Sequence, residues 1–149
     1  MLSARRVDKL REVSANCSRY GLEPFVLPMD VTQLDSHAGA LAAVIEQFGK
    51  VDTIVLNAGK SQRNPAMTTT FESTKELFDL NFFSVVHLNK LVTEHFIANK
   101  KGHIVVVSSL SGRIGTPISS SYSATKFALH GYFDALRAEV TKLHNIQVR

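Results

Sequence analysis

Two side chains that can transfer protons lie four residues apart, because Tyr122 and Lys126 are both found in the stretch SSSYSATKFALHG. Four residues make about one helical turn, so a phenol and an ammonium group at this spacing share one face of a helix. A free phenol has a pKa of about 10 and exchanges protons poorly at neutral pH, and a nearby cation stabilises the phenolate. The pair therefore predicts general acid–base chemistry at a carbonyl or an alcohol.

Two further polar residues precede this pair at positions that could serve the same chemistry. Ser109 lies thirteen residues before Tyr122 and follows the apolar run IVVV, where a hydroxyl can reach a bound carbonyl oxygen. Other serines lie close by, so serine abundance alone does not select it. Asn81 lies within the apolar stretch LFDLNFFSVVHL, and a buried mid-helix asparagine needs a partner, either a site water or a backbone group.

The elements that must position these residues follow from the apolar spacing. The predicted strands are FVLPMDV (25–31), VDTIVLN (51–57) and GHIVVVSS (102–109), and NIQVR (145–149) begins another. The predicted helices are Arg5–Tyr20, Gln33–Phe48, Phe71–Asn99 and Ser119–His144. Glycines at 21, 49 and 102 are expected to end helices. Thr69 and Glu72 have the capping-box spacing that is expected to begin the third helix. This alternation predicts an α/β fold with a parallel sheet covered by helices.

Length and composition exclude several classes of protein. The chain has 149 residues with 44% hydrophobic content, enough for one domain spanning 1–149. The chain contains no run of about 18 apolar residues, so no membrane-spanning helix is expected. The single Cys17 excludes a disulfide framework. The net charge of +4 is spread along the chain among acidic residues, so no nucleic-acid partner is expected. The six histidines show no metal-like spacing, so no metal site is expected.

Two short motifs at predicted strand ends are compatible with nucleotide binding. The Asp30 carboxylate could accept from an adenine amino group while the Val31 N–H serves a ring nitrogen, and a helix N-cap would explain Asp30 equally well. Asn57, Ala58 and Gly59 end the next strand with small residues that let the backbone approach a bound sugar. An ordinary strand-to-loop turn would also explain them.

The combined motifs resemble the short-chain dehydrogenase/reductase family. They are D-V at 30–31, N-A-G at 57–59, Asn81, and Ser109 followed by Y-x-x-x-K at 122–126. The segments LSARRVDKL, LPMDVT and GKSQRN are similar to the branch designated member seven. The resemblance implies a doubly wound parallel sheet of the Rossmann type. It also implies an oxidoreductase that interconverts a carbonyl and an alcohol on a small apolar substrate of steroid or retinoid type.

The resemblance also implies a role for each motif residue. Tyr122 would be the general acid or base, and Ser109 would hold the substrate oxygen. Lys126 would bind the nicotinamide ribose, and Asn81 would position a water in a proton relay. The cofactor-binding residues would be Arg5, Arg6, Asp30, Val31, Asn57, Ala58, Gly59, Tyr122 and Lys126. Since arginine pairs with a 2′-phosphate, Arg5 and Arg6 favour NADP(H) over NAD(H).

Departures from the family pattern predict an incomplete sheet. No T-G-x-x-x-G-x-G motif occurs in this stretch, although it opens the family's first strand–helix unit. That strand would lie between the strands that end at Ala4 and Asn57, and the family's last strands and substrate lid are also missing. We therefore expect residues 1–149 alone to be inactive. The alternative is a non-catalytic remnant that acts through its dimerisation helices.

The resemblance implies partners and a location as well. The helices Phe71–Asn99 and Ser119–His144 would form a homodimer. The whole protein would be associated with the endoplasmic reticulum membrane, whereas this chain as written would be soluble and cytoplasmic.

Overall fold

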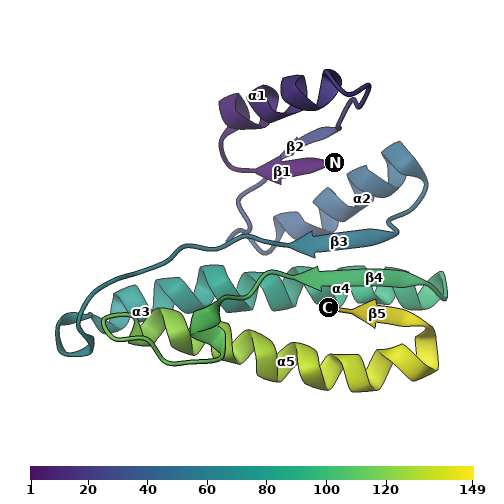
Figure 1. The fold of residues 1–149 in the computed structure, drawn as a ribbon. Coiled ribbons are helices and arrows are strands. Elements are labelled where there is room, and N and C mark those ends of the chain that lie inside the picture. Colours follow the sequence, from purple (N-terminus) through teal and green to yellow (C-terminus); the bar gives the residue numbers. More distant parts are fainter.

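A computed structural model describes all 149 residues as five short parallel strands and five α-helices (Figure 1). The strands are β1 (Leu2–Ala4), β2 (Val26–Pro28), β3 (Thr53–Leu56), β4 (Gly102–Val106) and β5 (Ile146–Val148). The helices are α1 (Val7–Ser18), α2 (Ser36–Phe48), α3 (Phe71–Phe78), α4 (Ser84–Ala98) and α5 (Ser120–His144). Short helical turns η1 (Ala66–Thr68), η2 (Asp79–Phe83) and η3 (Leu110–Gly112) complete the order.

The predicted α/β fold is confirmed, with every strand pair parallel. Each predicted strand and helix overlaps an observed one, but the third predicted helix is interrupted. Residues Asp79–Phe83 form a π-helical turn between α3 and α4. In such a turn the backbone hydrogen bonds reach one residue further than in an α-helix, and these turns are frequent at functional sites.

Two predicted helix ends were wrong. The N-cap of α3 is Thr70, whose hydroxyl accepts from the Ser73 N–H at 3.1 Å, and not Thr69. Gly102 does not close α4, because Lys100 has the positive φ of 53° and Gly102 begins β4. Gly102 is needed for another reason: a Cβ there would lie 2.1 Å from the ring of Phe96.

The core lies where α4 and α5 pack on the three-stranded sheet β3–β4–β5. Phe96 of α4, Ile104 of β4 and Ile146 of β5 are completely buried, and Leu129 and Phe133 of α5 are nearly so. Burying one such side chain contributes about 1.5–3 kcal/mol. This core fixes α5, and therefore the Tyr122–Lys126 face, against β4. No helix of the chain is both long and apolar enough to cross a membrane.

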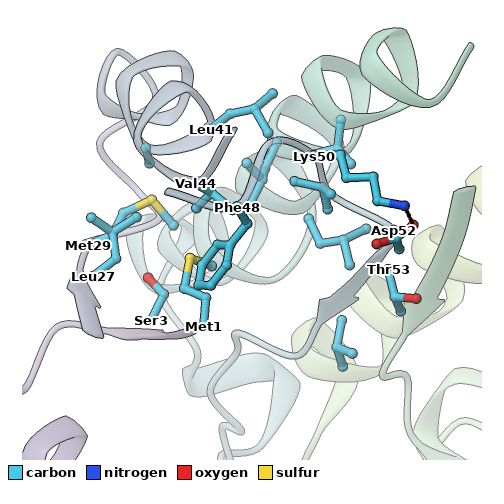
Figure 2. Close-up of a pocket in the computed structure, with 16 residues that line it drawn as sticks. Met1, Ser3, Leu27, Met29, Leu41, Val44, Phe48, Lys50, Asp52 and Thr53 are labelled. Atoms are coloured by element: carbon cyan, nitrogen blue, oxygen red, sulfur yellow. Dashed lines mark ion pairs between the residues drawn. The ribbon is translucent and has the colours of Figure 1, made fainter. Parts of the chain in front are cut away.

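The sheet is interrupted between β1 and β3, as the sequence predicts. Strands β1 and β2 pair only with each other, and β3 pairs with β4 alone. A cavity of about 650 Å³ lies in the gap. Figure 2 shows Ser3, Leu27 and Met29 on one side of it and Thr53 on the other, with Phe48 between them. The two sheets are therefore joined through helix packing and loops, without hydrogen bonds between strands.

Candidate active site

The first turns of α5 carry the predicted acid–base pair. Tyr122 is half-buried, and its hydroxyl makes no hydrogen bond within the protein. The Lys126 Nζ lies 6.0 Å from the centre of the Tyr122 ring and donates to the Val107 carbonyl at 2.9 Å. Burial lowers the pKa of Lys126, whose residue is only 5% exposed. The predicted helical face is thus present, with the ammonium group fixed and the phenol free to meet a ligand.

Ser109 follows β4 at the start of η3. Its Oγ accepts from the Ser111 N–H at 3.2 Å and caps this turn. Since a hydroxyl both accepts and donates, the Ser109 O–H hydrogen remains available for a ligand oxygen. The turn is held against α5, because a Cβ on Gly112 would lie 2.9 Å from the Lys126 carbonyl oxygen and 2.7 Å from the Ser108 hydroxyl.

Asn81 lies in the π-helical turn and is completely buried. Its Oδ1 accepts from the Lys60 N–H at 2.9 Å, and its Nδ2 donates to the Lys60 carbonyl at 3.0 Å and to the Thr125 hydroxyl at 3.1 Å. Of the two partners that the sequence left open, the structure shows the backbone group. Asn81 therefore ties the strand-end loop at Lys60 to the helix that carries Tyr122.

Replacing Asn81 by alanine tests this tie. We expect Asn81→Ala to lower the free energy of unfolding by about 1–3 kcal/mol, because it leaves the Lys60 backbone groups without their partner. Urea denaturation of the intact protein measures this change. Asn16→Ala, at an exposed position of α1, is the matched control and should stay within about 0.5 kcal/mol of wild type. Equal stability of the two variants would contradict the bridging role of Asn81.

Tyr122 and Ser109 line one pocket of about 330 Å³, here named the tyrosine pocket. Most of the other lining side chains carry hydroxyl groups, and Arg63 adds a cation that forms no ion pair in the structure. The loop of Arg63 is attached to the opposite wall, because the Asn64 N–H donates to the Ile118 carbonyl at 2.7 Å. The pocket therefore places Ser109 and Tyr122 on the wall of one shared space.

A second cavity, of about 520 Å³, brings most of the predicted nucleotide-binding residues together at the carboxyl ends of β1 and β3. We name it the strand-end cavity. Its lining includes Arg5, Arg6, Val31, Asn57, Ala58 and Gly59. A Cβ built on Gly59 would lie 3.2 Å from the Asn81 Oδ1 and 3.8 Å from the Lys126 Nζ. The cavity wall therefore adjoins the helix that carries Tyr122, although Asp30, Tyr122 and Lys126 do not line the cavity.

Asp30 forms a tight turn and does not cap α2, whose N-cap is Asp35. The Asp30 Oδ1 accepts from the Thr32 N–H at 3.0 Å and from the Thr32 hydroxyl at 2.8 Å. These two bonds lower the pKa of the Asp30 carboxyl group. Arg5, whose Nη1 lies 4.0 Å from the Asp30 Oδ2, lowers it to a smaller extent. The Val31 N–H has no partner in the protein. The turn thus offers an ionised carboxylate beside a free backbone donor.

Three residues of the site were not predicted from the sequence. Thr125 is completely buried and bonds both Asn81 and the Tyr122 carbonyl. Gly112 allows η3 to approach α5 closely, and the Val107 carbonyl holds Lys126. Thr125 and Gly112 have no local signal, because their contacts come from residues distant in the sequence.

A parallel sheet of the Rossmann type with a cavity at the carboxyl ends of its strands is the arrangement of dinucleotide-binding proteins. The family model for short chain dehydrogenases matches residues 1–149. The chain therefore belongs to the short-chain dehydrogenase/reductase family.

Relatives and solved structures agree with this assignment. The chain is 42% identical to mouse dehydrogenase/reductase SDR family member 7, covering 94% of this chain and 43% of the relative. It is 41% identical to the human protein of that name, covering 99% and 45%. A metagenomic short-chain oxidoreductase solved in complex with NADP superposes with a TM-score of 0.92 at 29% identity, covering 99% of this chain and 66% of that one. The chain thus spans less than half the length of the two curated relatives.

Proposed function

We propose that this chain is part of an NADP(H)-dependent reductase that interconverts a carbonyl and an alcohol. The observation that carries the proposal is the tyrosine pocket, where Tyr122 and Ser109 face one ligand site and Lys126 lies on the same helical face. A hydroxyl donor pair of this kind suits a substrate oxygen that gains or loses a proton. Measuring NADPH oxidation by the intact protein with a panel of ketones and aldehydes tests the proposal.

We propose that a nicotinamide dinucleotide binds along the strand-end cavity. Asp30 and the free Val31 N–H would hold the adenine, while Asn57, Ala58 and Gly59 would line its ribose. Tyr122 and Lys126 would meet the nicotinamide ribose, since the Gly59 wall adjoins Lys126. Arg5 and Arg6 lie at the same cavity and would pair with a 2′-phosphate. When bound, such a cofactor supplies the hydride in reduction and accepts it in oxidation.

The side chains of this chain would supply the proton and the orientation. In reduction, the Tyr122 O–H would donate its proton to the substrate oxygen, and the Ser109 O–H would hold that oxygen in place. The Lys126 cation would stabilise the resulting phenolate. Asn81, whose two amide hydrogens are donated to Lys60 and Thr125, would serve the proton transfer by holding the Lys60 loop against the helix of Tyr122. In alcohol oxidation the same groups would act in the opposite direction.

Cofactor preference can be tested at the Arg5 position, which is exposed and lies next to Asp30. We expect Arg5→Asp to shift the ratio of kcat/KM for NADPH over NADH toward NADH by about tenfold or more. A carboxylate repels a 2′-phosphate and accepts a hydrogen bond from a 2′-hydroxyl. Steady-state kinetics with both cofactors measures the ratio, and Arg11→Asp, at an exposed position further along α1, is the control. An unchanged ratio in Arg5→Asp would remove this residue from the phosphate site.

The resemblance favours a small apolar substrate of steroid or retinoid type as part of this proposal. The tyrosine pocket is polar around the site of the reacting oxygen. An apolar body would therefore extend toward the exposed side chains of Ile114 and Ile118, which follow η3.

We further propose a homodimer through Phe71–Asn99 and Ser119–His144. Large apolar side chains on these segments remain exposed, including Phe83 and Phe127. The endoplasmic reticulum location of the whole protein belongs to the same proposal. Sedimentation analysis of the intact protein tests the dimer.

A further inference from the structure

A pair of histidines joins α2 to α4 behind the Asp30–Thr32 turn, and the chemistry proposed above does not use it. His37 of α2 is completely buried and is bonded at both ring nitrogens. Its Nε2 lies 2.9 Å from the Val31 carbonyl oxygen, and its Nδ1 lies 3.0 Å from the Nδ1 of His87 in α4.

The partners fix the direction of these hydrogen bonds. A carbonyl oxygen only accepts, so the His37 Nε2 carries the hydrogen. In neutral His37 the Nδ1 is then an acceptor, and the His87 Nδ1–H donates to it. Burial, opposed by the Val31 bond and aided by His87, lowers the pKa of His37 and so favours the neutral ring. The result is a directed chain from His87 through His37 to the Val31 carbonyl.

The peptide unit between Val31 and Thr32 is thereby held at both of its polar atoms. His37 donates to its carbonyl oxygen, and the Asp30 carboxylate accepts from its N–H, that of Thr32. The Asp30 carbonyl also accepts from the Gln33 N–H at 3.0 Å. Within this locked turn the Val31 N–H is left unpartnered, and Val31 lines the strand-end cavity.

The histidine pair also crosses the interruption in the sheet. Val31 follows β2, which belongs to the two-stranded sheet, whereas His87 lies on α4, which packs on the three-stranded sheet. No strand hydrogen bonds join the two sheets. The pair thus places the turn relative to the half of the cavity formed by Asn57, Ala58 and Gly59.

We propose that His37, supported by His87, is a positioning residue that holds the Val31–Thr32 peptide so that Asp30 and the Val31 N–H can receive the adenine ring of the cofactor. This inference rests on the proposed function, because it assigns the adenine end to this turn. His37 itself touches no reacting atom. It acts through the backbone that it holds.

Binding of two cofactor halves to the intact protein, measured by calorimetry, tests the proposal. The probes are 2′,5′-ADP, which contains the adenine, and reduced nicotinamide mononucleotide, which lacks it. We expect His37→Leu to weaken 2′,5′-ADP binding by about fivefold to tenfold, the scale of one lost hydrogen bond. Binding of the mononucleotide should stay unchanged. His37→Gln, whose amide can still donate to the Val31 carbonyl, should restore most of the affinity for 2′,5′-ADP.

His95→Leu is the matched control, because the His95 Nε2 also bonds a backbone group, the Val51 N–H at 3.2 Å, away from the turn. It should leave the binding of both probes unchanged. If His37→Leu does not fold, His37→Asn replaces it, since its shorter amide cannot take the place of Nε2. Wild-type affinity for 2′,5′-ADP in a folded His37→Leu or His37→Asn protein, or equal weakening of both probes, would overturn the positioning role. Wild-type protein that binds neither probe would overturn the proposed function itself.

Discussion

Tyr122→Phe is expected to lower the turnover of carbonyl substrates by roughly 10²–10⁴-fold, the usual contribution of a positioned acid or base. The change removes one oxygen atom that has no hydrogen-bond partner in the protein. The free energy of unfolding should therefore change little. Initial rates of NADPH oxidation in the intact protein, together with urea denaturation, measure both quantities.

Tyr132→Phe is the matched control for this prediction. Tyr132 lies on the same helix and packs on Phe82 and Phe133, away from the tyrosine pocket. Loss of its hydroxyl should leave turnover close to wild type. Turnover in Tyr122→Phe equal to that of Tyr132→Phe would show that the phenol at 122 takes no part in proton transfer.

Lys126→Met should cause the second large loss, lowering turnover by roughly 10²–10³-fold because the phenolate loses its nearby cation. The free energy of unfolding should instead rise near neutral pH, because burial makes the lysine charge costly there. The pKa of Lys126 is lowered in the folded protein from its ordinary 10.5. The unfolded chain thus binds more protons between these two pKa values, and the wild type gains stability as the pH rises through that interval.

Urea denaturation near neutral pH and near pH 10.5 checks this. The rise in stability with pH should be smaller in Lys126→Met than in the wild type. Lys142→Met, at an exposed position of α5, is the control and should keep the wild-type rise. An identical pH dependence in Lys126→Met and the wild type would contradict the electrostatic cost assigned to the buried ammonium group.

The features that the sequence predicts well are those with a local period or spacing. The strands β3 and β4 contain the apolar runs IVL (54–56) and IVV (104–106), although Val55 of β3 is exposed. The four-residue spacing of Tyr122 and Lys126 places them on one face whatever α5 packs against. The expected parallel sheet also predicts that Val31, Asn57 and Gly59 meet at one cavity, and they do so although β2 and β3 belong to separate sheets here.

The features that the sequence does not predict depend on contacts between distant residues. Gly102 looks like a helix end, but its need for glycine comes from the Phe96 ring. Thr68, Thr69 and Thr70 are chemically equal candidates for the cap of α3, and the position of η1 decides among them. Thr125 and His37 have ordinary helical surroundings in the sequence, and only the folded chain shows that both are completely buried.

The π-helical turn at Asp79–Phe83 has a consequence for the phase of the long helical region. The inward-facing residues Leu77, Asn81, Val85 and Asn89 recur every four positions. In an ideal α-helix of 3.6 residues per turn, a four-residue step would drift about 40° around the axis each time. The wider π-helical turn compensates part of this drift. As a result, α4 is rotated about the helix axis relative to a regular continuation of α3. A design that rebuilt Phe71–Ala98 as one uniform helix would rotate Asn81 away from Lys60 or α4 away from its sheet.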